Sequence, residues 1–363
     1  MHITLDIKKF KQTLESVSKV CTKHITLPIL QCVLLEVKEN KLTIKATNLE
    51  IGIEGYIDVT QQEEGSVAIP ANILVQTINL ITQPTITLYK EGEMLIVESK
   101  SSRTEIKSIP LEDFPTIPHI QSTPYIIQGS LFALGIKTTA FTASQSSIKP
   151  ELGSIYIHQK KEHSLTFVAT DSFRLMEKTI PQKNITLEEP ILIPYKNALE
   201  LARVVEEVQG DVQIFITENQ CALSVDNIYI TSRLITGTFP DYTQIIPKEY
   251  KTNTTLLIND LSQALKKTNI FLNKFLQLTI TISGGTFTLS AQSGESGATT
   301  ESIQATVDGE EITLNFNQRY ISEALPHIQS ESIILKCAGF GRPMVIEGVH
   351  DNSLRYLVMP MNK

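Results

Sequence analysis

The sequence predicts an α+β protein built from three tandem copies of one fold. Three alternating apolar runs end alike: LTIKATNLEI contains Ala46, LTFVATDSFR contains Ala169 and FTLSAQSGES contains Ala291. These alanines are 123 and 122 residues apart, close to 121, one third of the 363-residue chain. A short strand leading into an amphipathic helix recurs after Pro70 and Pro194, which are 124 residues apart. We therefore expect three domains, at residues 1–121, 122–247 and 248–363.

Each copy contains the same order of elements. A helical repeat of apolar residues opens it, a second helix follows the strand-to-helix motif, and short stretches of period two lie between and after them. ITLYKEGEMLIVES and VQIFITENQCALSV predict hairpins that turn at Glu91-Gly92 and Glu218-Asn219. We expect two helices on one face of a mainly antiparallel sheet. The six predicted helices are 6–23, 70–82, 130–149, 195–208, 259–275 and 317–329.

Composition indicates an ordinary globular protein, with 41% hydrophobic and 20% charged residues. The start, MHITLDIKKF, has no long apolar run behind a basic flank, so we expect no signal peptide, no membrane partner and a cytoplasmic location. The cysteines are far apart and lack CxxC spacing, which favours reduced, buried thiols over a disulfide framework or a zinc site. They are Cys21, Cys32, Cys221 and Cys337.

The predicted helices are basic although the chain is acidic. They carry 13 basic and 7 acidic residues, whereas the formal net charge of the chain is −7. Lysines on one helix usually form only a solvated face. The same bias over all six helices fits a surface that meets phosphate groups, with an acidic remainder that repels them.

The sequence gives little sign of catalysis. It contains no HExxH, GxSxG, P-loop or Rossmann glycine motif, and its seven histidines lack ligand spacing, so we expect no metal and no cofactor. Asp171 and Asp241 have the side chains of acid/base residues, but each lies in a turn where an aspartate normally caps backbone amides. SGGTF at 283–287 predicts a turn between strands.

Five segments together resemble the bacterial DNA polymerase III beta subunit family, the sliding clamps. In family order they are HITLPILQCVLLEV (24–37), LEDFPTIP (111–118), VATDSFRLM (168–176), GTFPDYTQIIP (237–247) and YLVMPMNK (356–363). The resemblance implies three tandem copies of the DNA-clamp fold and a head-to-tail homodimer closed into a ring. Helices would line the inside of the ring, and antiparallel sheets would form the outside.

A ring of this kind would encircle double-stranded DNA without reading its sequence, as a non-catalytic processivity factor in DNA replication. The resemblance implies the DNA polymerase III alpha subunit, the clamp loader delta subunit, and other polymerases and repair proteins as partners. Each would insert a short hydrophobic peptide beside the apolar chain end. The alternative is a clamp-like paralogue with altered partner binding, because Ser172-Phe173 replaces the more usual Gly-His or Gly-Asn.

The resemblance also implies three sets of site residues. The partner-peptide groove would contain Leu152, Thr170, Ser172, Phe173, Arg174, Leu175, Pro240, Ile245, Asn317, Tyr320, Pro343, Leu357, Met359 and Met361. DNA would contact Lys9, Lys23, His24, Lys149, Lys196, Arg203, Lys266 and Lys267, with His24 in place of a frequent arginine. The dimer interface would contain Ile73, Leu74, Ile78, Thr104, Ile106, Ile270, Phe271 and Phe275.

Overall fold

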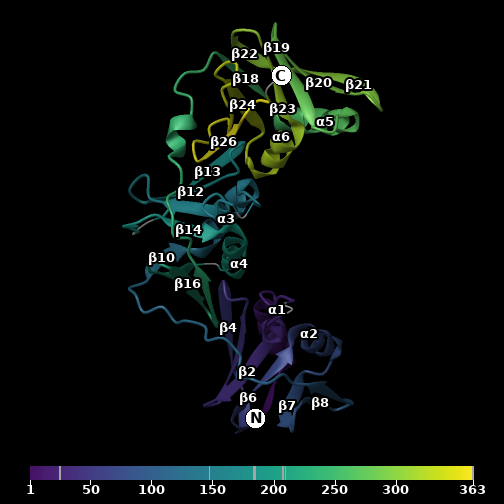
Figure 1. Ribbon diagram of the computed structural model, residues 1–363, viewed down its shortest axis with the longest axis vertical. Helices are drawn as coiled ribbons and strands as arrows, with labels where there is room; N and C mark the ends of the chain where they lie inside the picture. The colour runs from purple at the N-terminus through teal and green to yellow at the C-terminus, as the bar shows by residue number, and fades with distance from the viewer. Residues whose placement is uncertain (24–25, 147, 183–184, 207, 209, 362–363) are drawn as a thin grey trace. The chain divides into compact units, whose positions relative to one another are not determined.

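The computed structural model describes residues 1–23, 26–146, 148–182, 185–206, 208 and 210–361. The chain forms two compact units (Figure 1). Unit 1 contains Met1–Ala133 and Lys196–Leu234, and unit 2 contains Leu134–Tyr195 and Ile235–Lys363. Each unit therefore holds one terminal sequence copy and part of the middle copy.

Unit 1 contains two antiparallel sheets. The eight strands of its larger sheet are, in spatial order, β10 (Tyr125–Gln128), β15 (Asp211–Ile216), β16 (Gln220–Val225), β17 (Ile228–Arg233), β4 (Ile51–Asp58), β3 (Lys41–Thr47), β2 (Cys32–Lys38) and β6 (Gly65–Pro70). The five strands of its smaller sheet are β5 (Thr60–Glu63), β1 (His2–Asp6), β7 (Thr85–Glu91), β8 (Met94–Ser99) and β9 (Ser102–Lys107). Since β17 pairs with β4, the larger sheet crosses from the middle copy to the first.

Two helices of unit 1, α1 (Ile7–Ser18) and α2 (Ala71–Leu80), lie side by side (Figure 1). The Asp6 side chain accepts a hydrogen bond from the Lys9 amide and caps α1. The helix approaches β4 closely at Gly55, where an added Cβ would lie 2.2 Å from Thr13 Cγ2. Glycine is required there by packing.

Unit 2 also contains two antiparallel sheets. The nine strands of its larger sheet are β14 (Ile191–Pro194), β11 (Ser154–His158), β12 (Ser164–Thr170), β13 (Arg174–Pro181), β26 (Leu354–Val358), β25 (Met344–Gly348), β24 (Ser332–Cys337), β18 (Thr252–Leu257) and β22 (Thr306–Gly309). The four strands of its smaller sheet are β21 (Gly297–Gln304), β20 (Thr286–Ser293), β19 (Gln277–Ser283) and β23 (Ile312–Asn317). The β13–β26 pair joins the middle and last copies.

Helices α5 (Ile258–Thr268) and α6 (Gln318–Ala324) belong to unit 2. Helices α3 (Gly129–Thr139) and α4 (Tyr195–Val205) lie where the chain passes between units. Short 3-10 turns are η1 (Pro28–Gln31), η2 (Ala140–Thr142), η3 (Tyr242–Ile245), η4 (Asn269–Phe271) and η5 (Leu325–His327).

The threefold repeat is confirmed. Ala46, Ala169 and Ala291 are buried on the corresponding strands β3, β12 and β20, and Pro70 and Pro194 end the strands that precede α2 and α4. The hairpins predicted at residues 91–92 and 218–219 are present, and the 283–287 segment is the β19–β20 turn. The domain limits 1–121, 122–247 and 248–363 remain a prediction.

The predicted helices were too long at their carboxyl ends. The chain leaves α3 at η2, where the Thr139 hydroxyl donates to the Gly135 carbonyl and the Thr142 hydroxyl donates to the Ala169 carbonyl. It leaves α6 at η5, which contains Pro326. The apolar periodicity beyond these points belongs to turns that pack on the same core.

Candidate functional site

The turn between β12 and β13 is held by its own side chains. The Thr170 hydroxyl donates to the Arg174 carbonyl over 2.6 Å, and Asp171 Oδ1 accepts from the Phe173 and Arg174 amides, each over 3.0 Å. Ser172 has φ +77°, in the left-handed region that favours glycine. This geometry leaves the Phe173 ring 60% exposed beyond the sheet.

Arg174 is buried and joins this turn to α6. Its Nε donates to Asp171 Oδ2 over 3.0 Å, its Nη1 donates to Glu323, and its Nη2 donates to the Phe141 carbonyl over 3.0 Å. The guanidinium also lies 4.6 Å from the centroid of the Tyr320 ring. One cation thus fixes the positions of three chain segments.

The apolar chain end follows the edge of this turn. Strand β26 pairs with β13, and the Met359 amide then donates to the Phe173 carbonyl over 2.8 Å. Two residues later the Met361 amide donates to the Asn315 carbonyl over 2.7 Å, in the smaller sheet of unit 2. The half-buried tail therefore bridges the two sheets.

The structure brings the predicted groove residues together in unit 2 but divides them by burial. Exposed or half-buried positions are Ser172, Phe173, Pro240, Ile245, Asn317, Tyr320, Met359 and Met361. Six predicted contact residues are buried in the subunit instead: Leu152, Thr170, Arg174, Leu175, Pro343 and Leu357. Leu152, Leu175 and Leu357 pack in the core around Tyr242. Thr170 and Arg174 hold the β12–β13 turn.

The two candidate acid/base residues are caps, as predicted. Asp171 binds the turn amides described above. Asp241 accepts from the Thr243 amide and hydroxyl and from the Gln244 side chain, and these hydrogen bonds lower the pKa of its carboxyl. Both carboxylates are thereby committed to local structure.

The helices keep their basic excess. The six described α-helices carry nine basic and four acidic residues. Of the predicted DNA contacts, those exposed are Lys9, Lys23, Lys149, Lys196, Lys266 and Lys267.

Two of the predicted DNA contacts, Arg203 and Lys267, are engaged by other groups of the chain. Arg203 is half-buried, donates to Glu200 and to the Ser16 carbonyl, and so has less freedom to meet a phosphate. Lys267 pairs with Glu301 over 2.9 Å. His24 lies outside the described residues.

The predicted dimer residues also divide by burial. Leu74, Ile78 and Ile106 are core residues of unit 1, since their side chains are at most 3% exposed, and they leave no surface for a second subunit. Ile73, Ile270 and Phe275 are 46%, 68% and 60% exposed, whereas Thr104 and Phe271 are half-buried. Leu80, which the sequence prediction did not include, is 83% exposed at the end of α2. Its position one helical repeat after Ile73 was the available signal.

Other types of site are not evident in the described part of the chain. It contains no group of three or more His, Cys, Asp or Glu side chains placed to hold a metal ion. Its cysteines are free thiols, of which Cys32, Cys221 and Cys337 are buried. No helix found there is long and apolar enough to cross a membrane.

Comparison with known proteins covers the whole chain. Family models for the N-terminal, central and C-terminal domains of the DNA polymerase III beta subunit match residues 1–118, 126–241 and 243–362. The chain is 26% identical to the beta sliding clamps of Streptococcus pneumoniae serotype 4 and Vibrio cholerae serotype O1, over 99% of this chain and 99% or 100% of theirs. The crystal structure of the DNA polymerase III subunit beta from Pseudomonas aeruginosa superposes with a TM-score of 0.95 at 26% identity, covering 100% of both chains.

Proposed function

This chain belongs to the DNA polymerase III beta subunit family, and on that premise we propose that it works as a ring-shaped homodimer that encircles duplex DNA in the cytoplasm. It acts as a sliding clamp, a non-catalytic processivity subunit, and tethers the replicative polymerase. The observation that carries the proposal is that one sheet runs from each sequence copy into the next. This leaves two corresponding edge strands, one in the first copy and one in the last, without a partner in the described chain.

Each joint within the chain is an antiparallel strand pair. At the first joint β17 pairs with β4, and at the second β26 pairs with β13. The strands in the corresponding places of the remaining copies are β9 and β21, and each is the terminal strand of its sheet in the described chain. An exposed edge is a template for pairing. A second copy joined head to tail would pair β9 of one subunit with β21 of the other and close the ring.

The repeat also predicts the register of this pairing. Ala46 lies opposite Ile53, which in turn lies opposite Ile230. In the last copy Ala291 lies opposite Thr299, so Thr299 corresponds to Ile53. Ile230 is two residues after the first paired residue of β17, and Thr104 is two residues after the first paired residue of β9, so Thr104 corresponds to Ile230. We therefore expect Thr299 of one subunit to lie opposite Thr104 of the other.

Exposed apolar side chains flank both edges. Ile73 and Leu80 are on α2, which packs beside β9. Ile270 and Phe275 lie in and just after η4, which packs beside β21. Burial of four such side chains at one interface favours association by several kcal/mol, at about 25 cal/mol per Å² of apolar area.

The mass of the particle in solution tests the dimer. Analytical ultracentrifugation should show a dimer for the unchanged chain and a monomer for Ile270→Asp, because a charge replaces an apolar contact. Phe340→Asp is a matched control in the same unit, since Phe340 is 76% exposed on the β24–β25 turn and should leave the dimer intact. A dimeric Ile270→Asp variant at low micromolar concentration would contradict the interface.

The basic helices explain why the ring can stay on DNA and still slide. Lysines such as Lys9 and Lys266 attract phosphates without reading bases. A loaded ring should persist on circular DNA at moderate salt and be lost from linear DNA through its ends. Equal retention on both would mean that direct contact, and not topology, holds the protein.

The groove beside the chain end is proposed to receive partner peptides. Expected partners are the DNA polymerase III alpha subunit, the clamp loader delta subunit, and other polymerases and repair proteins. The half-buried Met359 and Met361 offer flexible apolar surface beside the exposed Phe173.

Deleting residues 359–363 removes this wall of the groove and leaves β26 in place. Loss of an anchor typically costs about 2 kcal/mol, so a hydrophobic peptide should bind about thirtyfold more weakly while the dimer remains. An unchanged affinity would contradict the groove. An intact ring whose unchanged groove binds no partner peptide would favour the paralogue.

A further inference from the structure

The β3–β4 turn in unit 1 repeats the β12–β13 turn of the groove bond for bond. The Thr47 hydroxyl donates to the Ile51 carbonyl over 3.0 Å and accepts from the Leu49 amide over 3.1 Å, as Thr170 does with Arg174 and Ser172. Leu49 has φ +77°, the value found at Ser172.

The Asn48 side chain takes the place of Asp171 in this turn. Its Oδ1 accepts from the Glu50 and Ile51 amides over 3.1 and 2.9 Å. The two turns thus have the same framework although only their threonine is identical.

The surroundings of the two turns correspond as well. Ser232 pairs with Ile51 as Val358 pairs with Arg174. The next amide, that of Arg233, donates to the Glu50 carbonyl over 2.9 Å, matching the Met359 bond to the Phe173 carbonyl. Unit 1 therefore contains a structural equivalent of the groove.

A cavity of about 300 Å³ lies at this place. Leu49 lines it and is 42% exposed, and the prolines of the FPTIP segment contribute a further apolar wall. Gly52 replaces the Leu175 of the groove, and the Ile117 side chain occupies the space that a Cβ would need, with its Cγ2 2.9 Å away. The Ile117 side chain, from the segment that links the first and middle copies, therefore lies where the groove of unit 2 has Leu175, and a cavity is still present beside it.

The charges distinguish this cavity from the groove. Glu50 stands in the position of Phe173 and Arg233 in that of Met359, and both line the cavity and are exposed. The Arg233 guanidinium makes no ion pair within the described residues. A guanidinium can donate two parallel hydrogen bonds to a carboxylate, and Leu49 offers apolar surface in the same cavity.

We propose that this cavity, the unit 1 groove, binds a short peptide that carries a carboxylate side chain next to an apolar one. Arg233 binds the carboxylate, and Leu49 with Pro115 and Pro118 contacts the apolar side chain. Among the described residues that line the cavity, Glu50 is the one acid, and it weakens binding of the peptide. The inference rests on the geometry of the turn and does not require that the chain encircle DNA.

Methyl NMR on the full-length chain, labelled at leucine and methionine, tests the proposal. The probe is acetyl-Leu-Asp-Leu-amide, and its matched control has lysine in place of aspartate. The Leu49 methyl signals, assigned with Leu49→Ile, report the unit 1 groove. The Met359 and Met361 methyl signals report the groove in unit 2, so the two sites are read separately in one titration.

We expect the aspartate peptide, and not the lysine peptide, to shift the Leu49 signals. Arg233→Gln should weaken this binding about threefold or more, and Glu50→Gln should strengthen it about twofold, because exposed charge pairs contribute modestly. The Arg233 and Glu50 side chains are exposed, so neither substitution should disturb the fold. Unchanged methionine signals from unit 2 would verify this. Unmoved Leu49 signals, equal binding of both peptides, or an unaffected Arg233→Gln variant would each overturn the proposal. If the Met359 and Met361 signals do not shift, only the proposed groove of unit 2 is contradicted.

Discussion

Replacing Arg174 with methionine should destabilise unit 2 strongly, because one buried cation satisfies three acceptors. The change leaves the Phe141 carbonyl without this donor and removes the partner of Asp171. Breaking a buried pair by removing one member typically costs about 3–5 kcal/mol. Asp171 keeps its two amide donors and Glu323 keeps Arg319, so we expect the lower end, about 3 kcal/mol.

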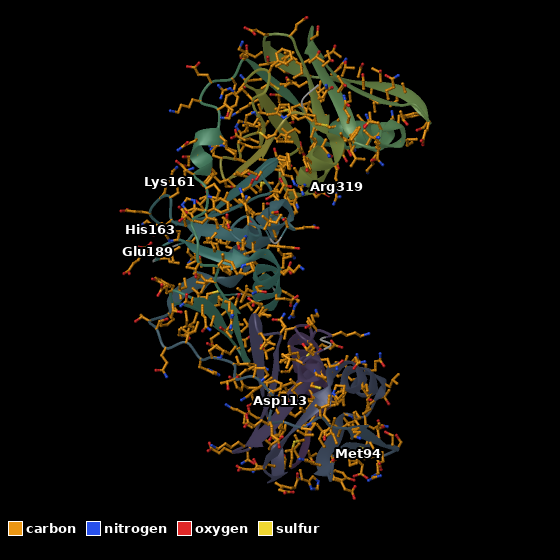
Figure 2. The ribbon with its side chains drawn as sticks, viewed as in Figure 1. Met94, Asp113, Lys161, His163, Glu189 and Arg319 are labelled. Carbon is orange, nitrogen blue, oxygen red and sulfur yellow. The ribbon has the colours of Figure 1, made fainter. Side chains whose placement is uncertain are left out.

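The matched control changes Arg319, which is labelled in Figure 2, to methionine. Arg319 binds the other oxygen of the same Glu323 but is 63% exposed. Exposed pairs contribute about 0–1 kcal/mol. Calorimetry should therefore show a fall in melting temperature of roughly 6–12 °C for Arg174→Met and at most about 4 °C for Arg319→Met. Equal losses for the two variants would refute the reasoning that burial of Arg174 sets its value.

The same pair predicts a pH dependence. Burial raises the pKa of the Glu323 carboxyl, but hydrogen bonds from Arg174 and Arg319 outweigh it and hold the pKa below its usual value. A lowered pKa stabilises the fold above the unfolded-state value and loses this contribution as the pH falls through the folded-state value. The stability difference between the unchanged chain and Arg174→Met should therefore shrink below about pH 4. A constant difference from pH 7 to pH 3 would contradict this.

Three further predictions follow from backbone geometry and burial. Ser172→Gly should raise stability by about 0.5 kcal/mol, since only the left-handed strain is relieved, and a lower melting temperature would contradict this. Gly309→Ala should cost about 2 kcal/mol or more because its Cβ would lie 2.0 Å from the Lys251 carbonyl oxygen, whereas Gly237→Ala, with open space, should be nearly neutral in urea unfolding. Burial raises the pKa of the Cys221 thiol to about 12, so iodoacetamide at pH 8 should label it only after unfolding, as mass spectrometry would show.

The repeat was predictable from the sequence because its signals are local. A buried alanine in an alternating strand and a proline before a helix recur at fixed spacing, and the structure places them on corresponding strands. Pairing across the joints, as between β17 and β4, was not predictable, since no local pattern specifies which distant strand lies next to an edge. For this reason the boundaries of the two compact units do not coincide with the boundaries of the three sequence copies.

The proposed groove residues were named from the sequence as one set, but the sequence did not show which of them are buried. Leu175 and Leu357 look like contact residues in a motif, yet tertiary packing buries them. The repeat aligns Leu49 with Ser172, each three residues after the repeated alanine, but their different side chains give no sign of the backbone conformation that the two positions share.

The joints also show why a connection between subunits must differ from one within the chain. Glu54, opposite Tyr229, and Glu177, opposite Arg355, are buried carboxylates at corresponding positions of the joining strands. A residue from the following linker hydrogen-bonds each carboxylate: His119 Nε2 lies 3.1 Å from Glu54, and the Tyr242 hydroxyl donates to Glu177 over 2.6 Å.

The corresponding residue on β21 is Thr300, next to the strand partner of Ala291. No covalent linker follows a joint between two separate subunits. A carboxylate placed there would lack the linker hydrogen bond and would keep only partners of the kind that Tyr56 gives Glu54 and Lys160 gives Glu177. A neutral side chain at Thr300 avoids that cost each time the proposed ring opens and closes. Thr300→Glu should therefore weaken the dimer, whereas Thr313→Glu, on the exposed face of β23 in the same sheet, should not. Equal dimer dissociation constants for the two variants would show that β21 does not form the subunit joint.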